Sequence, residues 1–265
     1  MGVTLDFRMI DHHHVVEFGG KAVNAAIAAN DASILVEYIR SIPFTPDAEV
    51  IAYRQARCDK LRELNAPSLI LENELRLLRL VNGEAYSYHA LSSQSLDELR
   101  IMLGTWGWAQ NSFSIHKAWF ELDWFLQPVE GPEESLLYPN RPQVGQPGQT
   151  LLDKAMMGAQ QSPVDSTGRP LIATCGSNED NCFGYNPPDS IAAIVDAISA
   201  VDPNDWSKWV PMRIGLYQRA DPESECVIEV VEQELAIALS EFSVLKKAYN
   251  DALDRGFGIA CEYSL

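Results

Sequence analysis

The chain has 265 residues, of which 46% are hydrophobic and 22% are charged. This composition is typical of a globular protein and excludes a largely disordered chain, a collagen-like chain and a disulfide-dense miniprotein. Because 20 Lys and Arg stand against 37 Asp and Glu, the net charge is −17. A chain this acidic is repelled by phosphate groups, so we expect no nucleic-acid or membrane partner and favour a basic protein partner instead.

Targeting signals are absent from the sequence. Residues 1–18 lack the basic segment and apolar run of a signal peptide, and no stretch reaches the ~18 consecutive apolar residues of a membrane span. Five widely spaced cysteines, an odd number, are typical of a reduced chain, so we expect a cytoplasmic protein. Cys175 and Cys182 could pair only in an oxidising environment.

The first half of the chain predicts one strand followed by helices. Residues 2–10 alternate apolar and polar side chains, which indicates a half-buried strand. A further helix is predicted over 115–126, with Ser114 as its cap and Pro128 as its end. The other helices predicted here cover residues 20–42, 47–65, 67–82 and 95–103.

The second half predicts loops, helices and a closing strand. Residues 128–150, rich in Pro and Gly, and the polar residues 175–188 are expected to be loops. Short elements are expected at 151–160 (helix) and 169–174 (strand). Longer helices are expected at 189–201 and 225–255, and a final strand at 257–264. We therefore predict an α+β fold that is rich in helix and has strands at both ends.

Three segments carry a resemblance to a known family. They are residues 114–126 (SIHKAWFELDWFL), residues 183–191 (FGYNPPDSI) and residues 245–256 (LKKAYNDALDRG). Together with the opening strand, they make the chain similar to the YfbM-like family, a domain of unknown function (DUF1877). This sequence departs from the family pattern at His116, where Asp is usual, and at Asn186, where Gly is usual.

The resemblance covers residues 1–14 and 106–265. It implies one YfbM-like domain over 1–265, in which residues 15–105 form a family-variable helical insertion. It implies no established reaction and no cofactor. Relatives occur among bacterial proteins encoded near secreted toxins, which implies an immunity-type role for an uncharacterised bacterial protein.

Residues 174–186 hold the candidate catalytic group. Cys175 precedes a glycine and would need a His base, for which His116 is the candidate, with Tyr185 nearby in the sequence. The alternative is that Cys175 is a small buried residue at the end of a strand. Phosphate-binding loops and hydrolase or kinase signatures are absent, so we favour a protein that is not an enzyme.

A run of three histidines is the candidate metal site. If the strand continues through residues 12–14, His12 and His14 share one face and could bind a transition metal. A third ligand would have to come from His89, His116 or a carboxylate. The alternative, a polar strand end or turn, is the one we favour.

Acidic clusters are the candidate binding surface. The acidic excess lies beyond residue 105, and the residues expected to bind a partner are Glu133, Glu134, Glu179, Asp180, Glu225, Glu229 and Glu232. Opposite charge speeds docking on a basic, toxin-like protein more than it strengthens the complex. We therefore predict a non-enzymatic protein-binding module of the immunity type; the alternatives are an enzyme of unrecognised type that uses residues 174–186, and acidity that serves solubility alone.

Overall fold

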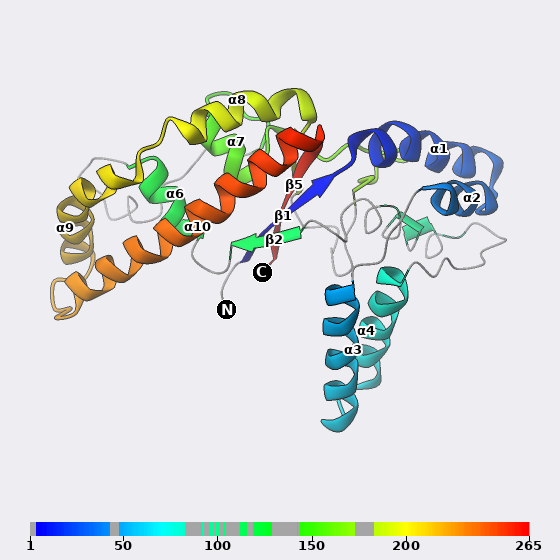
Figure 1. Cartoon of the computed structure of the whole chain (residues 1–265), viewed down its shortest axis with the longest axis horizontal. Coiled ribbons are helices and arrows are strands. Elements are labelled where there is room, and N and C mark those ends of the chain that lie inside the picture. The colour runs from blue at the N-terminus through cyan, green and yellow to red at the C-terminus, as the bar shows by residue number, and fades with distance from the viewer. Residues whose placement is uncertain are drawn as a thin grey trace. The chain divides into compact units, whose positions relative to one another are not determined.

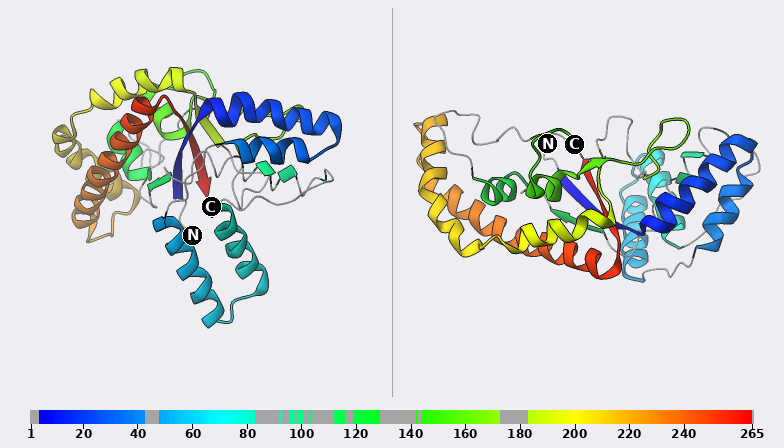
Figure 2. Two further views of the ribbon diagram at one scale, coloured as in Figure 1. Left: turned by 45° about the vertical axis from the view of Figure 1, so that its right-hand side comes forward. Right: turned by 90° about the horizontal axis from the view of Figure 1, so that it is seen from above.

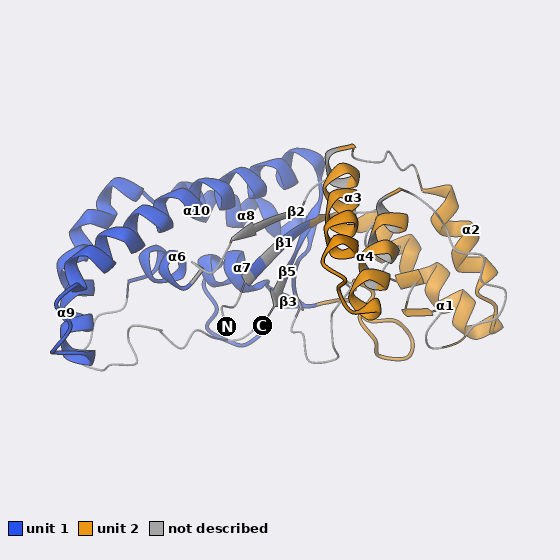
Figure 3. Ribbon diagram, turned by 90° about the horizontal axis from the view of Figure 1, so that it is seen from below, with its two compact units in different colours: residues 1–8, 113–161, 181–265 blue, residues 9–112, 162–180 orange. Residues whose placement is uncertain are grey.

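The computed structural model divides the chain into two compact units (Figure 3). Unit 1 contains residues 1–8, 113–161 and 181–265, and unit 2 contains residues 9–112 and 162–180. The predicted insertion, 15–105, lies within unit 2, and the single-domain assignment stays a prediction. The residues that the structure describes are 4–42, 48–82, 92, 96–97, 99–100, 103, 112–115, 119–128, 142, 144–172 and 183–264.

A five-stranded sheet, drawn mainly from unit 1, has the strand order β2-β1-β5-β4-β3, and Figure 1 labels its strands β2, β1 and β5. The opening and closing strands are neighbours in it, which confirms the expectation of strands at both ends. In β4 and β5, which pair antiparallel, Gly184 lies opposite Cys261. The strands are β1 (Thr4–Ile10), β2 (Ser112–Ile115), β3 (Gln160–Gln161), β4 (Phe183–Asn186) and β5 (Gly258–Ser264).

The helices of unit 1 gather around α10, which packs on α6, α8 and α9. It has 29 residues and ends at Gly256, whose φ of +66° suits glycine. Of the apolar residues spaced three and four apart along it, Val231, Phe242, Leu245 and Tyr249 are buried, whereas Ile228, Leu239 and Leu253 are exposed. In the core beside it, the ring of Phe125 stacks on Trp206, and Trp206 meets Phe242 edge to face. These helices are α6 (Trp119–Leu126), α7 (Leu151–Met157), α8 (Pro188–Ser199), η3 (Pro203–Trp209), α9 (Val210–Ala220) and α10 (Val227–Arg255).

Unit 2 consists mainly of two helical hairpins (Figure 2). The single helix predicted over 20–42 is in fact two, because Asn30 takes the left-handed conformation at φ 50° and ends the first. No described helix of the whole chain is long and apolar enough to cross a bilayer. The helices are η1 (His13–Phe18), α1 (Gly19–Ala29), α2 (Ser33–Ser41), α3 (Ala48–Glu63) and α4 (Ser68–Val81).

Three predicted elements are wrong in position or type. Residues 112–115 alternate Ser with Phe or Ile and form β2, so the helix predicted over 115–126 begins only at Trp119. Residues 183–186, expected in a loop, form β4 because β3 and β5 supply their hydrogen-bond partners. Residues 169–172 are no strand, since Pro170 makes only an isolated bridge to Val164. The fold class itself, helix-rich α+β, is confirmed.

Candidate functional site: an acidic corner between α9 and α10

Five exposed carboxylates surround the turn from α9 into α10, and we call this set the acidic corner. Among the described residues, none of the five forms an ion pair, so their charges face solvent without a neutralising cation. The set consists of Asp221, Glu223, Glu225, Glu229 and Glu232.

Glu225, Glu229 and Glu232, which the sequence predicts to bind a partner, lie exposed at this corner of unit 1, and their role in binding stays a prediction. Asp221 and Glu223 lie at the same corner and were not predicted as binding residues. The sequence does show acids at every second position from 221 to 225, which could have indicated them. The other predicted binding residues, Glu133, Glu134, Glu179 and Asp180, lie outside the described residues.

Helix electrostatics account for part of this arrangement. The start of a helix carries a partial positive charge, which favours an acid such as Glu229 in the first turn of α10. Asp221 and Glu223 precede the helix, and the Asp221 side chain accepts a hydrogen bond from the Glu223 amide at 3.3 Å. The helix dipole therefore accounts for the position of Glu229. It does not account for the other four carboxylates of the acidic corner.

An apolar stripe runs beside these acids along α10. Ile228 is 57% exposed and Leu239 37% exposed, and Leu235 lies half-buried between them. Their spacing of seven and then four residues puts the three on one helical face. An apolar centre with a charged border is the usual anatomy of a protein–protein interface.

A buried ion pair fixes α9 against α10 beneath the corner. Nε of Arg213 donates to Oε2 of Glu234 at 3.0 Å, and the Tyr217 hydroxyl donates to the same carboxylate. The guanidinium of Arg213 lies 4.8 Å from the ring centre of Trp124 on α6. Because removing one partner of such a pair would leave a buried charge, the cluster holds the three helices in one arrangement.

Glu121 on α6 adds another carboxylic acid side chain to the surroundings of this pair and was not among the predicted site residues. Its Oε2 is buried and accepts no hydrogen bond from the described residues. Burial raises the pKa of the Glu121 carboxyl, and the nearby Glu234 raises this pKa further, while Arg213 opposes the shift. Since Arg213 and Glu234 come from distant helices, no local sequence signal places Glu121 beside them.

Of the three predicted catalytic residues, the structure describes Tyr185 alone. Tyr185 lies fully buried in β4, its hydroxyl against the backbone of Gly258. Cys175 and His116 lie outside the described residues, so the catalytic hypothesis stays a prediction.

The neighbouring Asn186 is a structural residue. Its amide donates to the Tyr249 hydroxyl at 2.9 Å and to the Lys154 carbonyl at 2.7 Å, and it accepts from the Ala159 amide at 2.8 Å. These bonds tie β4 to α7 and α10. Because every polar atom of the Asn186 amide group finds a partner, its full burial is stable.

The histidine run does not lie on a strand, as the metal hypothesis required. β1 ends at Ile10, and the Asp11 side chain accepts from the His14 amide at 3.0 Å, which turns the chain into the π-helix η1. The ring of His14 contacts the Asp11 carboxylate at 2.7 Å, and that of His13 contacts Glu17 at 2.8 Å. Around His12 and His14, the described residues supply no group of three metal ligands.

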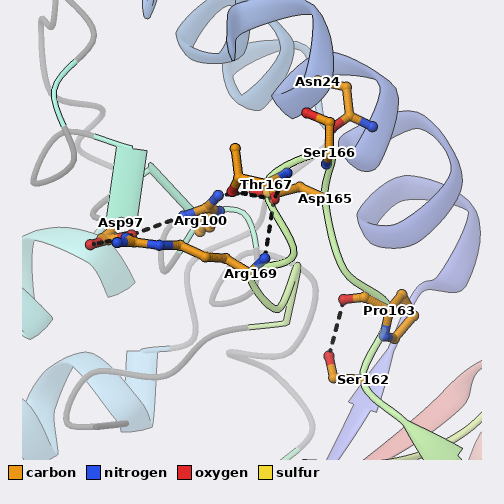
Figure 4. A network of polar contacts seen from close by, with 9 residues as sticks. All are labelled: Asn24, Asp97, Arg100, Ser162, Pro163, Asp165, Ser166, Thr167 and Arg169. Atoms are coloured by element: carbon orange, nitrogen blue, oxygen red, sulfur yellow. Dashed lines mark hydrogen bonds and ion pairs between the residues drawn. The ribbon is translucent and has the colours of Figure 1, made fainter. Parts of the chain in front are cut away.

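A polar network in unit 2 holds the turn at residues 165–169 (Figure 4). Oδ1 of Asp165 accepts from the Thr167 amide at 2.7 Å, and Oδ2 pairs with the buried Arg100. Arg100 and Arg169 share the carboxylate of Asp97. Burial lowers the pKa of Arg100 and the nearby Arg169 lowers it further, while Asp97 counteracts this shift. Arg100 and Asp165 are buried at the centre of this network, whereas Asp97 and Arg169 are about half exposed at its edge, so the network mainly serves the packing of unit 2.

Comparisons with known proteins give a resemblance in structure alone. The chain matches no family model and no curated protein sequence. Its structure is similar to the crystal structure of YfbM from Escherichia coli, a protein of unknown function, with 18% sequence identity and a TM-score of 0.38. The similarity covers 58% of this chain and 81% of that protein. The YfbM-like resemblance predicted from the sequence is thereby confirmed as a resemblance, and it assigns no activity.

Proposed function

We propose that this chain is a protein-binding module without catalytic activity, and that the acidic corner binds a basic protein. The observation that carries the proposal is the set of five exposed, un-neutralised carboxylates beside the apolar stripe of α10. The carboxylates and the apolar side chains would contribute to binding in different ways. The carboxylates attract a cationic partner, and burial of the apolar side chains supplies binding energy.

The support beneath the corner favours binding with little rearrangement. The Arg213–Glu234 pair fixes α9 on α10, so the carboxylates are carried by elements that are already in place before a partner arrives. A surface ordered in advance loses less conformational entropy on association. The net charge of −17 adds long-range attraction, which raises the association rate at low salt.

The partner class we propose is a toxin-like basic protein, with this chain as its immunity protein in the cytoplasm. A cationic face that contacts nucleic acid or another acidic substrate would be covered by the acidic corner. Cys58, Cys226 and Cys261 are free thiols, which fits a reducing compartment.

The test is native capture from the source cells at low and at high salt, with bound proteins identified by mass spectrometry. The test variant carries Glu225→Lys, Glu229→Lys and Glu232→Lys. The control carries the same change of charge at exposed acids elsewhere, namely Glu37→Lys, Asp196→Lys and Asp254→Lys. We expect the wild type and the control to retain one stoichiometric basic protein at low salt, and the test variant to lose it.

Two results would overturn the proposal. One is equal retention by the test variant, which would move the binding surface elsewhere. The other is recovery of the wild-type chain alone at low salt, which would remove the basic partner.

A further inference from the structure

The α3–α4 hairpin has a charged group at its seam. Glu74 of α4 is almost fully buried, and its carboxylate pairs with Arg54 at 2.6 Å and with Arg57 at 3.1 Å. Cys58, fully buried, lies on the same helix as the two arginines. The two helices are therefore joined by a buried ion cluster.

The apolar residues of α4 exceed what α3 can cover. Eight of its 14 residues are large and apolar, spread over more than one face, whereas a single neighbouring helix covers one stripe. Leu69 is 67% exposed, and Leu64, in the connection between the helices, is exposed to the same extent. The eight residues are Leu69, Ile70, Leu71, Leu75, Leu77, Leu78, Leu80 and Val81.

Cover from the rest of the described chain is also lacking. α3 and α4 lie side by side in both views and pack on each other (Figures 1 and 2), and neither packs broadly on any other described element. Tyr53 on α3 is 59% exposed as well. The hairpin thus presents apolar surface that is available to a partner.

The charge of the hairpin favours a second copy of this chain as that partner. Residues 48–81 hold six Lys and Arg and five Asp and Glu, a net charge of +1 within a chain of −17. Outside this hairpin, the excess negative charge makes two copies of the chain repel each other. The hairpin is nearly neutral, so two copies can form a contact through it without this repulsion. Exposed groups of both signs, among them Asp59, Lys60 and Arg79, allow pairing across a two-fold axis.

The dimensions fit a familiar assembly. Helices of 16 and 14 residues are about 24 and 21 Å long. Two antiparallel hairpins of this length make a four-helix bundle, in which part-exposed leucines of both copies form the core. We propose that this chain forms a homodimer through the α3–α4 hairpin, on a surface separate from the acidic corner.

Sedimentation equilibrium of the full chain tests the dimer. The wild type is expected to rise from 29.5 kDa toward twice that mass as its concentration increases. Leu69→Glu with Ile70→Glu places unpaired carboxylates in the proposed core and should raise the dimer dissociation constant at least about 100-fold. Leu253→Glu, at an exposed apolar position of α10, is the matched control and should dimerise like the wild type. Circular dichroism checks that all three chains keep their helix content.

The dependence of dimerisation on salt concentration distinguishes this dimer from association through the acidic corner. Added NaCl screens the repulsion between the two acidic chains, so the proposed dimer should become tighter. A wild type that stays monomeric at every concentration would overturn the proposal. A dimer that the double variant retains, or one that salt weakens, would also overturn it.

Discussion

At the scale of single residues, burial and distant neighbours decide how the acids of this chain behave. Glu121 and Glu229 are the same residue type, yet one lies within a buried cluster and the other lies in solvent. The buried Glu121 carboxyl loses its hydration and faces Glu234, so its pKa is raised. Glu234 itself is held by Arg213 and Tyr217.

Replacing Glu121 by Gln should therefore stabilise the protein at neutral pH. An acid whose pKa is higher in the folded state stabilises the fold fully below its unfolded pKa of about 4.3, and this stabilisation is lost as the pH rises through the folded value. Gln mimics the protonated form at every pH. The urea midpoint of Glu121→Gln should exceed that of the wild type at pH 7, and the difference should shrink as the pH falls below about 4, where the Glu121 carboxyl of the wild type is protonated in both the folded and the unfolded state.

The matched control for this prediction is Glu37→Gln on the exposed face of α2. Its urea midpoint should stay close to that of the wild type at both pH values, because surface substitutions change stability by only about 0.5 kcal/mol. A Glu121→Gln variant that is less stable than the wild type at pH 7 would contradict the assignment of Glu121 as a buried, destabilised carboxylate.

At the scale of elements, β4 shows how close packing selects a residue. Gly184 in this strand lies against the backbone of Met157 at the end of α7, so near that a Cβ atom would overlap the Met157 carbonyl. Gly158, with φ +91°, turns the chain away at the same place. The approach of α7 to β4 therefore depends on the absence of side chains at these two positions.

Gly184→Ala should destabilise unit 1 by about 3 kcal/mol or more, because backbone rather than a flexible side chain would have to move. Gly215→Ala on α9 is the control, since its new methyl group would find only the tip of Arg219 at 3.5 Å. A helical Gly→Ala change of this kind should be neutral or stabilise by about 0.5–1 kcal/mol. Urea unfolding of both variants measures the contrast, and equal effects would refute the close packing of α7 on β4.

At the scale of the whole molecule, excess negative charge opposes folding. A net charge of −17 produces repulsion that the compact state feels more strongly than the extended one. The exposed ion pairs, such as Lys247 with Asp251, contribute little in the other direction because water and salt screen them.

Moderate salt should accordingly stabilise this protein. The screening length falls from about 30 Å at 0.01 M salt to about 10 Å at 0.1 M, which is short enough to reduce repulsion between distant acids. We expect the urea midpoint to rise over this range equally in NaCl and KCl. A midpoint that falls with salt would mean that exposed ion pairs, such as Lys247 with Asp251, outweigh the repulsion.

The elements with local signals could be predicted from the amino-acid sequence. Apolar residues at steps of three and four followed by Gly256 predict α10, and alternating side chains predict β1 and β5. The sequence likewise predicts the helix-rich α+β architecture, the resemblance to the YfbM-like family and three acids of the acidic corner. These features depend on residues within a few positions of one another, so periodicity, caps and composition are enough to find them.

Features that depend on contacts between residues far apart in the sequence became visible in the folded structure and not before. The sequence of β4, which contains Gly184 and Asn186, predicts a loop. It forms a strand in the structure because β3 and β5 lie on either side and supply hydrogen-bond partners. Glu121, Arg213 and Glu234 come from three helices and meet only when those helices pack. The histidines leave the expected strand because Asp11 turns the chain. Ladder hydrogen bonds, burial and buried charge act across space, and no spacing along the chain encodes them.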